Sequence, residues 1–285
     1  MVHSLKPLSG ADGVFAMAAL DHRESLRTML REHGGAPFDE FKLAGVRALA
    51  PLATALLLEL ETARRPECRA ALPPSTGLIL AADVFDQPPG QPVLDSGLDE
   101  RITPAVAEEV GAHALKLLVL WRPDSGLDER ARLMERFAEL CRRCGLVSLV
   151  EGIVRPPAGR PWTAAGERHE AIFTAALELC SFGVDVYKAE MPGYLPGDVS
   201  RVREASVAFD RALGRPWVVL SNGVRAEDFR PAMTEAVAGG AHGFLAGRAV
   251  WSTVLDRTDI ETALDTVAAE RLRSFASAAR EARLT

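Results

Sequence analysis

Eight short apolar runs, each followed by turn or polar residues, recur along this chain of 285 residues. Segments with apolar residues at helical spacing lie between many of them, at 127–143, 167–182, 199–213, 226–238 and 260–283. Short runs that alternate with amphipathic helices are typical of parallel α/β folds. The eight runs lie at 14–20, 55–60, 77–82, 114–121, 146–151, 184–190, 217–221 and 243–246.

Eight strand-and-helix units in a chain of this length favour a (β/α)₈ TIM barrel over a doubly wound sheet. A Rossmann-type sheet is the alternative, but no G-x-G-x-x-G motif opens a helix after a strand. The Pro/Gly-rich stretch 87–92 follows the third run, and we interpret it as a βα loop over the active face rather than an interdomain linker. We therefore predict one (β/α)₈ domain over residues 1–285.

Composition narrows the classes of function. Hydrophobic residues make up 48% of the chain and charged residues 25%, which is ordinary for a globular protein. The net charge of −6, without a basic cluster, argues against binding to nucleic acid or to an anionic membrane. No long apolar stretch or export signal is visible, so we expect a cytoplasmic protein. Cys141 and Cys144 lack a second pair of metal ligands, which favours reduced structural thiols over a zinc or redox site.

Lys188 lies near the end of the apolar run 184–190, which predicts an amine on a buried strand. Burying an ammonium without a partner costs several kcal/mol, so such a lysine is either paired or has a lowered pKa. A free amine attacks carbonyl groups. The alternative is a structural ion pair with Glu190, two residues further on.

Polar residues end other runs, and in a barrel these strand ends meet at one face. Asp21 ends the first run, Lys116 lies within the fourth, and Glu151 ends the fifth. Two neighbouring lysines would lower each other's pKa, and burial acts in the same direction, so we expect one neutral amine near pH 7 at a Schiff-base site. Alternatively, Lys116 and Glu151 form a structural ion pair, which is compatible with that role.

The last two runs end in residues suited to binding phosphate. Loops after strands 7 and 8 of such barrels often hold a phosphate through small residues and backbone N–H groups, and an arginine adds a charged hydrogen bond. We therefore predict a phosphate site that includes Ser221, Asn222, Gly223, Gly247 and Arg248.

Six blocks of the sequence resemble the class I aldolases that cleave tagatose 1,6-bisphosphate, and more closely their relative that cleaves 6-deoxy-6-sulfofructose 1-phosphate. The blocks fall in order along nearly the whole chain. They are 15–24 (FAMAALDHRE), 115–122 (LKLLVLWR), 145–151 (GLVSLVE), 154–157 (VRPP), 187–192 (YKAEMP) and 243–251 (GFLAGRAVW).

The resemblance implies a (β/α)₈ aldolase that uses no metal or other cofactor and acts on a phosphorylated ketose. In the sulfosugar branch the products would be dihydroxyacetone phosphate and 3-sulfolactaldehyde. It also implies that Lys188 forms the Schiff base, that Glu151 is the acid/base residue, and that Lys116 and Asp21 orient intermediates. Relatives of this kind further imply a homo-oligomer.

The sequence departs from the family pattern at three places that we expect to line the substrate end. His22 stands where Gln is usual, Gly152 stands where Pro is usual, and the segment 59–65 does not match. By analogy with the sulfosugar branch, Arg155 and Arg122 are candidates for binding the distal anion. Their alternative is a pairing in the loops with Asp124 or Glu129.

Three hypotheses for the function are open from the sequence. The first is cleavage of 6-deoxy-6-sulfofructose 1-phosphate, and the second is the same chemistry on tagatose 1,6-bisphosphate or another ketose 1-phosphate. The third is a catalytically idle sensor of sugar phosphates, which would need the phosphate site but not Lys188, Lys116, Glu151 and Asp21.

Overall fold

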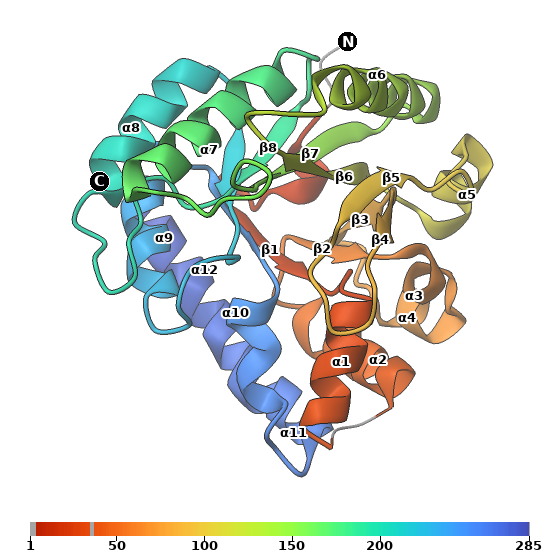
Figure 1. Ribbon diagram of the computed structural model, residues 1–285. Helices are drawn as coiled ribbons and strands as arrows, with labels where there is room; N and C mark the ends of the chain where they lie inside the picture. Colours follow the sequence, from red (N-terminus) through yellow and green to blue (C-terminus); the bar gives the residue numbers. More distant parts are fainter. Residues whose placement is uncertain (1–3, 35–36, 285) are drawn as a thin grey trace.

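Eight parallel strands close into a barrel in the computed structural model, which describes residues 4–34 and 37–284 (Figure 1). Their order around the barrel is β1-β10-β9-β8-β7-β6-β3-β2. This arrangement confirms the predicted (β/α)₈ fold. The strands are β1 (Phe15–Ala19), β2 (Ala55–Leu58), β3 (Gly77–Ala81), β6 (Ala114–Trp121), β7 (Val147–Val154), β8 (Val186–Ala189), β9 (Trp217–Val219) and β10 (Gly243–Ala246).

Helices surround the barrel and cover its outer face (Figure 1). None of those in the described part of the chain is long and apolar enough to cross a membrane. The α-helices are α1 (Glu24–Glu32), α2 (Phe38–Leu49), α3 (Leu60–Arg64), α4 (Pro66–Ala71), α5 (Pro104–Val110), α6 (Leu127–Cys144), α7 (Ala165–Cys180), α8 (Val202–Leu213), α9 (Phe229–Ala238), α10 (Arg248–Trp251), α11 (Ile260–Ala263) and α12 (Ala269–Arg283). Short 3₁₀-helices at Lys6–Leu8 and Ser252–Val254 and a π-helix at Leu264–Ala268 complete the set.

Alternation along each strand divides the core into two parts. Successive side chains of a strand point to opposite faces, so every second residue points into the barrel. Phe15, Met17, Ile79, Leu149 and Val218 belong to the inner cluster. The residues between them pack outward against the helices. The lower barrel is therefore filled by apolar side chains, and polar groups can enter only near its open end.

Two elements differ from the sequence-based expectation. The residues around the Pro/Gly-rich stretch form an antiparallel hairpin, β4 (Asp83–Asp86) with β5 (Asp95–Leu98), whose tip lies at the pocket as expected for a loop over the active face. The expected single helix 260–283 is divided into α11, the π-helix and α12.

Candidate active site

The predicted catalytic residues continue the inward-facing series of their strands. After the last apolar inward position, the next inward residue is polar at the end of six strands. One of them, Glu59 after β2, pairs with Lys42. The other five form one layer at the C-terminal end of the barrel. In order along the chain they are Asp21, Asp83, Lys116, Glu151 and Lys188. Glu151 and Lys188 are direct partners in the β7–β8 register, so their side chains start side by side.

Glu151 links the two lysines. Its Oε2 lies 2.9 Å from Lys188 Nζ and 2.9 Å from Lys116 Nζ. The structure thus brings together the predicted nucleophile, acid/base residue and second amine. Lys188 does not pair with Glu190, the alternative weighed from the sequence. Strand β8 ends at Ala189, and Glu190 binds Arg168 instead.

Lys116 sits among three carboxylates, and this corrects one expectation. Its Nζ lies 2.9 Å from Asp21, 3.0 Å from Asp83 and 2.9 Å from Glu151. Burial lowers the pKa of Lys116, but the three carboxylates outweigh burial and hold that pKa well above its ordinary value. Lys116 is therefore a charged ammonium, and the expectation that the two lysines lower each other's pKa is wrong for Lys116.

The two predicted carboxylates are ionised in this layer. Burial alone would raise the pKa of Glu151, but Lys116 and Lys188 lower it below its usual value. The pKa of Asp21 is likewise lowered, because Lys116 and other nearby cations outweigh burial. A carboxylate held ionised beside an amine can accept a proton from a bound hydroxyl group.

Asp83 belongs to this layer and was missed in the sequence analysis. It is fully buried, contacts Lys116 and accepts a hydrogen bond from the Leu118 N–H at 2.9 Å. Arg23 Nη2 lies 3.3 Å from Asp83 Oδ1 and its guanidinium stacks over Phe85. The alternation of the run 77–82 offered a signal for Asp83, because residues 79, 81 and 83 share one face.

His22 lines the pocket as a neutral ring. Burial lowers its pKa to about 3, although Asp21 acts in the opposite direction. Its Nδ1 is buried without a hydrogen-bond partner among the described residues, and it lies 3.8 Å from Asp21. The ring packs edge-on against Trp251 at 5.0 Å. A neutral imidazole in this position can exchange hydrogen bonds with a substrate hydroxyl group.

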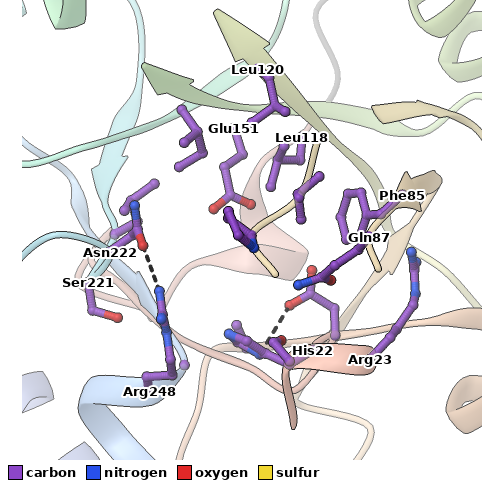
Figure 2. A pocket seen from close by; sticks show the side chains of 18 of the residues that line it. His22, Arg23, Phe85, Gln87, Leu118, Leu120, Glu151, Ser221, Asn222 and Arg248 are labelled. Carbon is purple, nitrogen blue, oxygen red and sulfur yellow. Dashed lines mark hydrogen bonds and ion pairs between the residues drawn. The ribbon is translucent and has the colours of Figure 1, made fainter. Parts of the chain in front are cut away.

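Most of the predicted phosphate residues gather on one side of the pocket. Figure 2 shows Ser221, Asn222 and Arg248 together, and Arg248 Nη2 donates to Asn222 Oδ1 at 2.6 Å. Gly247 also lines the pocket, and a Cβ there would lie 2.4 Å from His22 Cε1, so this position must stay small. Gly223 has φ +76° and forms the turn behind Asn222, outside the pocket lining.

Only one of the two arginines predicted for the distal anion faces the pocket. Arg155 lines it, half buried, and its guanidinium makes no hydrogen bond or ion pair with any residue in 4–34 or 37–284. The expectation that Arg122 binds the distal anion is wrong, because its guanidinium donates to the Pro156 carbonyl and lies outside the pocket lining. Neither arginine pairs with Asp124, which instead accepts from the Ala158 N–H.

Two of the three departures from the family pattern do not line the pocket, contrary to expectation. Gly152 alternates with the inward Glu151 and faces outward, where Tyr187 leaves no room for a Cβ. In the segment 59–65, Glu59 is buried outside the pocket lining and pairs with Lys42 at 2.8 Å. Only His22 contributes to the pocket wall.

The pocket is a cavity of about 400 Å³ at the barrel mouth, a size suited to a small ligand. Arg23, Phe85 and Gln87 stand across it from Ser221 and Arg248 (Figure 2). Within residues 4–34 and 37–284, no three His, Cys, Asp or Glu side chains form a group that could hold a metal ion. Burial raises the pKa of Cys141 and Cys144, as expected for structural thiols.

Known proteins resemble this chain over most of its length. The family described as DeoC/LacD family aldolase matches residues 15–253. Tagatose 1,6-diphosphate aldolase of Staphylococcus haemolyticus is 28% identical, covering 87% of this chain and 84% of that protein. The enzyme of the same name from Streptococcus pneumoniae strain R6 is 29% identical, covering 87% and 83%.

Two solved structures share the fold. Fructose-bisphosphate aldolase from Plasmodium falciparum superposes with a TM-score of 0.72 at 17% identity, over 96% of this chain and 92% of that one. An archaeal fructose-1,6-bisphosphate aldolase superposes with a TM-score of 0.66 at 19% identity, over 97% and 98%. At these identities the likeness supports the barrel architecture.

Proposed function

Because the chain belongs to the DeoC/LacD family of aldolases, we propose that it cleaves a ketose 1-phosphate through an imine on Lys188. The observation that carries this proposal is the contact of Lys188 Nζ with the ionised Glu151 at the mouth of the barrel. Ser221, Asn222 and Arg248 offer a phosphate site in the same pocket. The known tagatose 1,6-diphosphate aldolases support the same class of reaction.

In the proposed reaction the amine of Lys188 adds to the C2 carbonyl, and loss of water gives a protonated imine. Glu151 then takes the proton of the C4 hydroxyl group and the C3–C4 bond breaks. The C4 fragment leaves as an aldehyde, and the electrons of the broken bond move into the imine to form an enamine. Protonation of C3 and hydrolysis release dihydroxyacetone phosphate and free Lys188. Lys116 and Asp21 hold Glu151 and the hydroxyl groups in place.

Borohydride tests the imine directly, because it reduces a protonated imine to a stable secondary amine. Incubation with dihydroxyacetone phosphate and borohydride should add the reduced ketone to Lys188, as read by peptide mass spectrometry. The Lys188→Ala variant should give neither adduct nor cleavage. Turnover of that variant at the wild-type rate would remove the mechanism.

We further propose that the ketose carries a second anion, bound by the guanidinium of Arg155, which has no hydrogen-bond or ion-pair partner among the described residues. Tagatose 1,6-bisphosphate fits this proposal and is supported by the names of the relatives. The 6-deoxy-6-sulfofructose 1-phosphate also carries a distal anion, and it rests on the sequence resemblance alone. Both place a negative charge on C6, with which the half-buried Arg155 would form a charge-assisted hydrogen bond.

Release of dihydroxyacetone phosphate from these two ketoses and from fructose 1,6-bisphosphate would compare the substrates. Arg155→Ala should raise the KM for any substrate with a distal anion, by roughly tenfold or more if a charged hydrogen bond is lost. The matched control is Arg122→Ala, which removes an arginine outside the pocket and should leave the KM unaltered. Equal effects of the two substitutions would contradict the role of Arg155.

A further inference from the structure

Glu190 is a buried carboxylate beside the active site that the proposed reaction does not use. It is 2% exposed and both its oxygens accept hydrogen bonds. Oε2 accepts from the Val154 N–H at 2.8 Å, and Oε1 accepts from Arg168 at 2.9 Å and from the Asn222 amide at 3.3 Å. The backbone N–H, the guanidinium and the amide NH₂ group are all donors, so Glu190 acts only as an acceptor.

Asn222 connects Glu190 to Arg248. Because the Asn222 NH₂ group donates to Glu190, its carbonyl oxygen faces the other way and accepts from Arg248 at 2.6 Å (Figure 2). A carboxylate can only accept and a guanidinium can only donate, so the two partners together fix the orientation of the amide. Arg248 is thereby held at the pocket wall.

The turn at residues 221–223 also packs against the ion pair of Arg168 and Glu190. Gly223 has φ +76°, and a Cβ there would lie 2.8 Å from Arg168 Nη2 and 3.9 Å from Glu190 Oε1. The backbone that carries Ser221 and Asn222 therefore packs directly on the pair of Arg168 and Glu190.

We propose that Glu190 is a positioning residue for the phosphate end of the pocket, acting through the Asn222 amide to hold Arg248 ready for the phosphate. This inference rests on the proposed function, because Arg248 is the phosphate ligand there. Glu190 itself does not touch the substrate. It gives the amide one orientation, so that Arg248 does not have to be ordered when the phosphate arrives.

The substitution Glu190→Gln disturbs this pattern without changing the size of the side chain. Glutamine has one acceptor oxygen and one NH₂ group, so it cannot accept from donors on both sides. Its NH₂ group meets either the Val154 N–H or the side of Arg168 and Asn222. In the second orientation the Asn222 amide must turn over and present its own NH₂ group to Arg248. Two donors then face each other and Arg248 is released.

The test measures how much ketone half-saturates the borohydride trapping of Lys188, with dihydroxyacetone phosphate and with unphosphorylated dihydroxyacetone. Glu190→Gln should raise this concentration roughly tenfold for the phosphate ester, the effect of one hydrogen bond to a charged group. For dihydroxyacetone the change should stay within about twofold, because no phosphate is bound. Asn222→Ala should give a similar rise, and the double variant should add little, as expected for residues that act in series.

Glu178→Gln is the matched control. Glu178 is a carboxylate bound by Arg130 and by the indole N–H of Trp121, and it lies outside the pocket lining. The same substitution there should leave the half-saturating concentration of both ketones unaltered. A shift equal to that of Glu190→Gln would show a general loss of packing and would overturn the positioning role.

Other outcomes separate the inference from the function on which it rests. Absence of an adduct in the wild-type protein would remove the proposed function. An adduct in the wild type together with wild-type half-saturation in Glu190→Gln would overturn only the role of Glu190, as would an equal rise for both ketones. If Glu190→Gln does not fold, Asn222→Ala decides, because a wild-type response there overturns the connection to Arg248.

Discussion

Lys116 explains how three carboxylates can share one buried layer. Asp21, Asp83 and Glu151 would repel one another in a low dielectric, and the ammonium between them offsets that repulsion. Its charge also keeps Glu151 ionised, which the proposed proton transfer requires. The structural and the catalytic interpretation of Lys116 are therefore compatible, as the sequence analysis allowed.

Replacement of Lys116 by methionine should cost both stability and activity. The change leaves buried carboxylates without their counter-ion, and breaking a buried pair costs about 3–5 kcal/mol. Urea unfolding should show this loss, and cleavage should fall with it. Adding Asp83→Asn removes one uncompensated charge and should restore part of the stability. Stability equal to the wild type in Lys116→Met would contradict the charge balance proposed here.

His22 should make stability depend on pH. Its pKa is about 3 in the folded protein against 6.5 ordinarily, so between these values the unfolded chain binds a proton that the folded chain does not. Its contribution is fully present above about pH 6.5 and is lost as pH falls towards 3, by up to about 1.4 kcal/mol per pH unit. The free energy of unfolding at pH 7, 5.5 and 4 should fall more steeply for the wild type than for His22→Gln. If the free energy of unfolding falls equally with pH in the wild type and in His22→Gln, His22 does not make this contribution.

The sequence can predict where a side chain lies when strand alternation decides its direction. Lys116, Glu151 and Lys188 lie inside buried runs, and their position in the run sets the face on which they lie. The same argument would have found Asp83. It could not place Arg122, because the direction of a loop side chain depends on the path of the loop, which local periodicity does not encode.

At the scale of elements, all eight barrel strands were predictable and the β4–β5 hairpin was not. The barrel strands are apolar on both faces, because one face meets the inner core and the other meets the helices. Strands β4 and β5 have sequences DVFD and DSGL, which carry acidic residues and too few apolar ones to read as strands. Their pairing joins residues on the two sides of the Pro/Gly-rich stretch, which the sequence pattern does not show.

Gly152 provides a test of how β7 and β8 pack. A Cβ at this position would lie 1.9 Å from the Tyr187 hydroxyl, so Gly152→Ala should lower the free energy of unfolding by about 1–3 kcal/mol. Adding Tyr187→Phe removes the hydroxyl and should recover part of that loss. Gly166 in α7 has open space around its Cβ position, and Gly166→Ala should stabilise the helix by roughly 0.5–1 kcal/mol. Thermal unfolding that ranks the two alanine variants in the reverse order would refute this account of the packing.

At the scale of the whole molecule, stability and chemistry occupy different levels of the barrel. The lower inner positions, such as Ile79, Leu57 and Val186, are apolar and fully buried. The next inward positions hold the charged layer, and the pocket opens above it. The fold therefore rests on a packed apolar plug, and the reacting groups stand on top of it at the ends of different strands.

This separation predicts that the two properties can be changed independently. Ile79→Ala creates a cavity in the plug and should lower the free energy of unfolding by about 2–5 kcal/mol, as measured by urea denaturation. The kcat/KM of the folded variant should stay within about twofold of the wild type, because Ile79 does not line the pocket. Lys188→Ala should abolish cleavage but leave the barrel folded, because Glu151 keeps Lys116 as its partner. A loss of kcat/KM greater than about tenfold in folded Ile79→Ala would mean that the plug sets the geometry of the charged layer, and the two levels would then be one mechanical unit.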